Sequence, residues 1–63
     1  MENLTNTEKL QTVCGFLQLA LIQMKELHNA KDVSLQDFLK IESVIQNYEL
    51  NIKKINELIE KWN

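Results

Sequence analysis

An apolar seven-residue repeat runs through the second half of this 63-residue chain. Its members alternate at steps of three and four residues over four heptads, and they are Phe38, Ile41, Ile45, Tyr48, Ile52, Ile55, Ile59 and Trp62. Charged and amide side chains occupy most of the positions between them. Because this spacing places apolar side chains along one side of an α-helix, it predicts a helix whose apolar seam packs on another helix.

A second apolar repeat precedes this one in the chain. It again follows steps of three and four, and its members are Leu10, Val13, Cys14, Leu17, Ala20, Leu21, Met24 and Leu27. Three further large apolar side chains, Phe16, Leu19 and Ile22, fall outside that stripe. The middle of this helix is therefore apolar around most of its circumference, which is not typical of a helix that faces water on one side.

Polar residues mark the start of each predicted helix. Thr5 and Glu8 have the spacing of a capping box, in which the side chain of each residue bonds the backbone N–H of the other. Ser34 and Asp37 repeat that spacing before the second apolar repeat. The chain has no proline and one glycine, so few other residues interrupt the helices.

The expected fold is all-α, an antiparallel two-helix hairpin that packs like a coiled coil. We expect a single domain over residues 1–63, with helices over about 6–29 and 35–61 and a turn at about 30–33. One shared seam cannot cover all of this apolar surface, and burying each large aliphatic side chain is worth about 1.5–3 kcal/mol. We therefore expect two hairpins to pair as a homodimeric four-helix bundle, or the hairpin to join the helices of another protein.

Two sets of residues are candidates for these contacts. The expected assembly interface consists of Leu17, Leu21, Met24, Ile45, Ile52, Ile55 and Ile59. The expected surface for a partner protein consists of Phe16, Leu19, Ile22, Leu50, Leu58 and Trp62.

Composition narrows the class of partner. Nine acids and seven lysines give a net charge of −2, there is no arginine, and the lysines are spread among the acids along the chain. Arginine is the residue best suited to bidentate phosphate contacts, so this composition argues against a nucleic-acid surface. The most apolar segment, residues 13–24, is too short to span a bilayer, and a single cysteine cannot form an internal disulfide. We expect a cytoplasmic protein that does not contact membranes.

No cluster of residues has the spacing that catalysis or metal binding requires. His28 is the only histidine, and it lies 14 residues from Cys14 along the same predicted helix. The carboxylates of the second helix lie on its solvated side among lysines, without the apolar surroundings that acid–base catalysis by a carboxyl group requires. We therefore expect no enzymatic activity, no metal and no cofactor.

The favoured function is a small protein-interaction module, a dimeric regulator or inhibitor that binds a partner protein. Seven asparagines and lysine in place of arginine are typical of an AT-rich genome, which favours a bacterial or phage source. A structural subunit of a larger helical assembly is one alternative. The length and helix-turn-helix plan also resemble the ROP-type plasmid copy-number regulators, and this resemblance implies an RNA-binding four-helix bundle as another.

Overall fold

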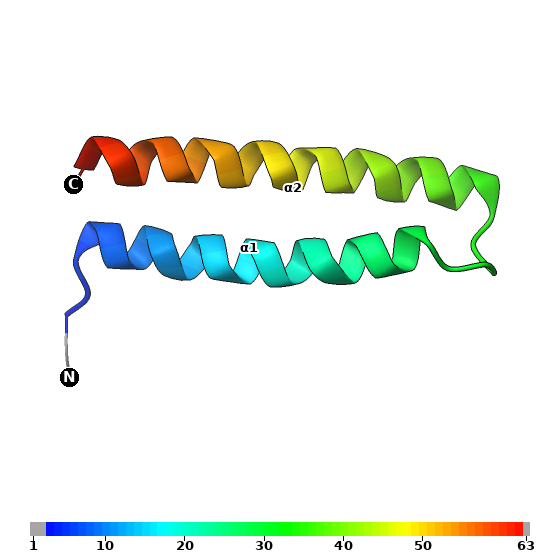
Figure 1. Cartoon of the computed structure of the whole chain (residues 1–63), viewed down its shortest axis with the longest axis horizontal. Coiled ribbons are helices and arrows are strands. Elements are labelled where there is room, and N and C mark those ends of the chain that lie inside the picture. The colour runs from blue at the N-terminus through cyan, green and yellow to red at the C-terminus, as the bar shows by residue number, and fades with distance from the viewer. Residues whose placement is uncertain (1–2, 63) are drawn as a thin grey trace.

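The computed structural model describes residues 3–62, which fold as two helices side by side (Figure 1). Helix α1 spans Asn6–His28 and helix α2 spans Leu35–Trp62, and the described part of the chain contains no strand. The all-helical fold and the packing of α1 against α2 are confirmed. Helix α1 ends one residue before its expected end at 29, and α2 ends one residue after its expected end at 61. Residues 1, 2 and 63 of the expected domain lie outside the described range.

The start of α1 has the predicted capping box. The Glu8 backbone N–H donates to Thr5 Oγ1 at 3.1 Å, and the Thr5 backbone N–H donates to Glu8 Oε1 at 2.9 Å. These bonds satisfy two N–H groups that have no partner within the helix. At the other end, Lys25 and His28 lie in the last turn, where positive charge is favourable.

A cap and a ring contact fix the connection between the helices. Ser34 Oγ accepts a hydrogen bond from the Asp37 backbone N–H at 3.2 Å, which supplies the Ser34 half of the predicted capping box. The His28 ring stacks on the Phe38 ring, with centroids 4.0 Å apart and planes 26° apart. The end of α1 is thereby held against the first turn of α2, and the two helices run antiparallel.

Half-buried side chains form one seam between the helices, and their spacing is a strict seven-residue repeat. On α1 they are Thr7, Leu10, Leu17, Leu21, Met24 and His28, and on α2 they are Phe38, Ile41, Tyr48, Ile52, Ile55 and Ile59. Cys14 and Ile45 occupy seam positions too, and they are the only buried residues in the described range, with 7% and 8% of their surface exposed. The apolar repeat thus predicts most of the seam. Val13, Leu27 and Trp62 of the expected repeats are instead exposed, because their positions lie at the edge or the open end of a seam that only one neighbouring helix covers.

The hairpin is one helix thick. Its Cα extents are 44 × 25 × 12 Å and its radius of gyration is 14.8 Å, whereas about 10.6 Å is typical of a compact chain of this length. It exposes 5218 Å² of surface, whereas a compact monomer of 7.4 kDa exposes about 4200 Å². A single layer has no interior, so each seam residue stays partly open to water.

The cap of α1 can be tested with two threonines of the same helix. Thr5→Ala removes the side-chain acceptor for the Glu8 N–H and should lower the free energy of unfolding by about 1 kcal/mol. Thr12→Ala is the matched control, because Thr12 Oγ1 bonds only the Glu8 carbonyl within the helix, an arrangement that is not stabilising. Urea denaturation followed by circular dichroism gives both values. Equal losses for the two variants would contradict the assigned cap.

The same cap predicts a pH dependence. The pKa of the Glu8 carboxyl lies below its ordinary value because the carboxylate accepts the Thr5 backbone N–H, with a smaller contribution from the Thr5 side chain. A carboxyl whose pKa is lowered by folding stabilises the fold above its unfolded pKa, and this contribution is lost as pH falls through the folded pKa. Glu8→Gln should therefore reduce stability at neutral pH and flatten the decline of stability as the pH falls below 4.5, the ordinary pKa of the carboxyl. An unchanged pH profile would show that Glu8 is not coupled to folding.

Candidate functional site

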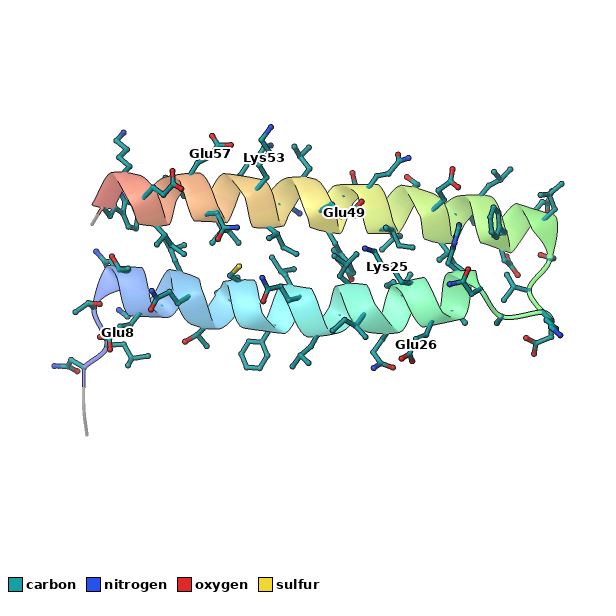
Figure 2. All side chains as sticks on the ribbon, in the orientation of Figure 1. Glu8, Lys25, Glu26, Glu49, Lys53 and Glu57 are labelled. Carbon is teal, nitrogen blue, oxygen red and sulfur yellow. The ribbon has the colours of Figure 1, made fainter. Side chains whose placement is uncertain are left out.

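The seam divides the hairpin into two long flanks of different chemistry. One flank is marked by an ion pair in which Lys25 Nζ lies 3.5 Å from Glu49 Oε2, and Figure 2 shows the two side chains pointing toward each other between the helices. Residues seven apart share a flank of a helix packed in this way. The polar flank is accordingly made of Gln11, Gln18, Lys25, Glu42, Glu49 and Asn56.

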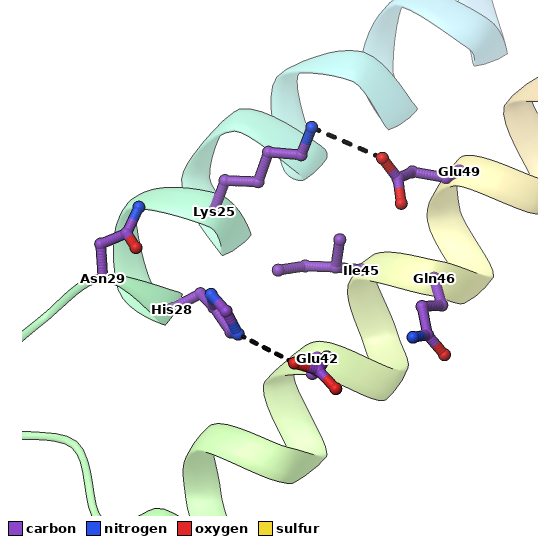
Figure 3. Close-up of a pocket in the computed structure, with 7 residues that line it drawn as sticks. All are labelled: Lys25, His28, Asn29, Glu42, Ile45, Gln46 and Glu49. Carbon is purple, nitrogen blue, oxygen red and sulfur yellow. Dashed lines mark ion pairs between the residues drawn. The ribbon is translucent and has the colours of Figure 1, made fainter.

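A shallow hollow of about 410 Å³ lies on the polar flank near the connection (Figure 3). Its lining residues are Lys25, His28, Asn29, Glu42, Ile45, Gln46 and Glu49. His28 Nε2 lies 3.5 Å from Glu42 Oε2, close enough for an ion pair when the ring is protonated, yet this buried nitrogen makes no hydrogen bond within the described residues. Both carboxylates of the hollow therefore already face a basic group of the same chain.

A thiol contact also joins the helices on this side. Cys14 is a free cysteine, and its Sγ donates to Asn56 Oδ1 at 3.7 Å. Across residues 3–62, no three His, Cys, Asp or Glu side chains gather as a metal site would require. Over the same residues, neither α1 nor α2 has the length and apolar character of a membrane-crossing helix.

The opposite side of the seam is the apolar flank. On α1 it consists of Val13, Ala20 and Leu27, and on α2 of Val44, Asn51 and Leu58. Val13 and Leu27 each expose almost half of their surface, although both are large apolar residues. This flank is narrow, apolar and open, in contrast with the polar flank.

The expected assembly interface lies on the seam. Ile45 is buried, and the half-buried members are Leu17, Leu21, Met24, Ile52, Ile55 and Ile59. These side chains hold α1 against α2 of the same chain. Their role between two chains stays a prediction.

The expected partner surface is exposed but is not one surface. Phe16, Leu19 and Ile22 follow one another at steps of three on the side of α1 that faces away from α2, with 67%, 61% and 52% of their surfaces exposed. We name these three residues the outer stripe. On the other helix, Leu58 belongs to the apolar flank and Trp62 lies beside it, whereas Leu50 is alone among polar residues on the outer side of α2.

The sequence analysis did not predict two features of the surface. Val13, Ala20 and Leu27 belong to one flank, and Lys40, Lys54 and Lys61 share one border of α2 beside that flank. These three lysines are far apart in the sequence but lie on the same side of α2, because positions a multiple of seven apart share one side of such a helix. The signal that finds both features is a seven-residue repeat in a second phase.

Gly15 lies on the same row of α1 as Ile22, seven residues before it. A Cβ added there would meet no atom within 4 Å among the described residues, and the backbone has no positive φ. Glycine within a helix costs about 1 kcal/mol relative to alanine. The hairpin alone therefore gives no reason for a glycine at this position.

Gly15→Ala should stabilise the isolated hairpin by about 0.5–1 kcal/mol, because alanine has the higher helix propensity and the added methyl group is unobstructed. Gln18→Ala, one turn further along α1, is the control and should change stability by only a few tenths. Chemical denaturation measures both. A loss of stability in Gly15→Ala would show that another chain already packs against this position.

Comparison with known proteins assigns no family to the chain. No protein-family model, no curated protein and no solved structure matches it. The functional argument therefore depends on the chain's own surfaces.

Proposed function

We propose that this protein is a small interaction module that pairs with itself and binds a partner protein through an apolar helix surface. Such a module acts by occupancy, as a regulator or inhibitor that covers a surface of its target. The free and buried Cys14 thiol is compatible with the reducing cytoplasm of a bacterial or phage-infected cell.

One observation carries this proposal, the excess of exposed over buried apolar side chains. Among residues 3–62, two residues are buried, whereas eleven large hydrophobic residues are exposed. They are Leu4, Val13, Phe16, Leu19, Ile22, Leu27, Leu35, Leu39, Leu50, Leu58 and Trp62. Single exposed apolar residues are ordinary on protein surfaces, but contiguous groups of them are typical of interaction sites.

The one-layer shape supports self-association. A stable domain buries its apolar faces between at least two layers of secondary structure, and this hairpin supplies one layer 12 Å thick. Pairing two hairpins about a two-fold axis forms a four-helix bundle, in which the same surface of each chain covers the other. The half-buried seam residues would then face a common core.

The outer stripe supports the binding of a different protein. Phe16, Leu19 and Ile22 form a continuous apolar row on one helix, a form of surface that fits an apolar groove or a neighbouring helix of a partner. Gly15, next to this row, leaves room for the partner's backbone to approach closely. The stripe also lies away from the seam, so its occupation need not disturb the hairpin.

The test is affinity capture from cells that encode the protein, followed by a binding titration with the purified captured protein. Leu19→Glu places a charge in the middle of the outer stripe and should weaken binding by about tenfold or more. Gln18→Glu adds a negative charge one residue away on the polar flank and should leave binding within about twofold. Circular dichroism confirms that both variants keep their helices.

Equal binding by the two variants would remove the outer stripe from the target surface. Capture that disappears in both variants would show that charge itself, and not the apolar row, determines recognition.

A further inference from the structure

We infer that a second copy of this chain covers the apolar flank, and that α1 of each copy lies against α2 of the other. This inference rests on the proposed function, and it identifies the flank that takes part in self-association and the arrangement of the pair. Four observations lead to it: the excess area, the uneven burial across the seam, the charge along the borders of the flank and the levels of the residues.

The surface that the hairpin exposes beyond that of a compact monomer is about the area of one long face. The chain exposes about 1000 Å² more than a compact monomer of its mass. A stable interface of standard size buries about 800 Å² on each partner. Covering one long face of the hairpin therefore accounts for the excess, whereas covering both faces would require more surface than the excess provides.

Burial across the seam shows which face is open. The seam residues next to the polar flank include Cys14 and Ile45, the two buried residues. The seam residues next to the apolar flank include no buried residue of the described range, and they are Leu10, Leu17, Met24, Ile41, Tyr48, Ile55 and Trp62. Beside the first row the Lys25–Glu49 ion pair bridges the two helices, whereas no ion pair of residues 3–62 lies beside the second row, whose members are half-buried or, at Trp62, exposed. The second row and the apolar flank thus form one continuous open surface.

The borders of this flank favour one of two arrangements. Face-to-face pairing about a two-fold axis places each helix either on its own equivalent or on the other helix of the second copy. The border of α2 carries Lys40, Asn47, Lys54 and Lys61, and that of α1 carries Lys9, Phe16 and Gln23. Pairing α2 with α2 would bring two lysine-rich borders together. Pairing α1 with α2 instead places the lysine-rich border of each copy on a border whose single lysine, Lys9, lies near Lys61, so that Lys40 and Lys54 have no lysine opposite them.

Contacts within the hairpin predict which residues meet. Four side-chain contacts join α1 to α2, and the numbers of their paired residues sum to 66, 70, 70 and 74. Level residues of the two helices therefore have numbers that sum to about 70. A two-fold axis parallel to the helices keeps every residue at its level. Phe16 of one copy is then level with Lys54 of the other, where the lysine stem can cover the ring and the ammonium group can lie over its face.

The arrangement also separates self-association from target binding. Leu19 and Ile22 lie on the far side of α1 and remain exposed in the pair, and Phe16 lies at the boundary between the two surfaces. The polar flank, with its ion pairs, remains in water. The same helix therefore contacts a second copy with one side and a different protein with another.

The first experiment measures solution mass by light scattering. The wild-type protein should have twice the 7.4 kDa mass of the chain. Val13→Glu places a charge on the apolar flank and should reduce the mass to that of one chain, whereas Ile22→Glu, a matched change on the outer stripe, should leave it doubled. A single-chain mass for the wild type overturns the inference, as does loss of the dimer in Ile22→Glu but not in Val13→Glu.

The second experiment tests the arrangement by cross-linking, and it does not depend on a destabilised variant. In a Cys14→Ala background, Phe16→Cys combined with Lys54→Cys should form a covalent dimer on mild oxidation, and reduction should release single chains. Lys54→Cys alone should remain mostly uncoupled. Efficient dimerisation through Lys54→Cys alone would show that α2 lies on α2 and would overturn the proposed arrangement.

The two proposals fail in different ways. A wild-type dimer that binds no partner protein contradicts the target-binding function and leaves the pairing intact. A wild-type monomer that still binds a partner through Leu19 contradicts the pairing alone.

Discussion

Two helices packed side by side share a single seam, and a single layer of helices encloses no interior. In this chain the seam runs the full length of the hairpin, yet it buries only Cys14 and Ile45 among the described residues. Hydrophobic burial is the main favourable term in folding, and a hairpin that leaves eleven large apolar residues exposed forgoes much of it. The exposed apolar surfaces of the hairpin, and the contacts proposed for them, follow from this lack of an interior.

The two flanks differ in the side chains that border the seam. On the polar flank, long charged side chains extend over the seam, and their ion pairs are exposed enough to contribute little to stability. On the apolar flank, Val13 and Leu27 each expose almost half of their surface, and none of the described seam residues beside them is buried. In the proposed pair, a second copy covers the open apolar flank, while Leu19 and Ile22 of the outer stripe remain exposed for a target.

Much of the fold can be predicted from the sequence because its signals are local. The apolar repeat from Phe38 onward fixes the seam of α2, and Thr5 with Glu8 fixes the start of α1 through bonds between residues three apart. The division of exposed residues into surfaces could not be predicted in the same way. Leu50 and Leu19 are equally apolar in the sequence, but one is alone among polar neighbours and the other belongs to a continuous stripe.

The sequence by itself determined two helices, their caps and most of the residues that meet between them, because helical periodicity and capping depend on neighbours within one or two turns. Only the tertiary structure decided which side of the seam is covered. That choice depends on pairs far apart in the chain, such as Lys25 with Glu49 and Cys14 with Asn56, which bring long polar side chains over one flank. No pattern within either helix specifies these pairs, because they form only once the two helices are packed at one register.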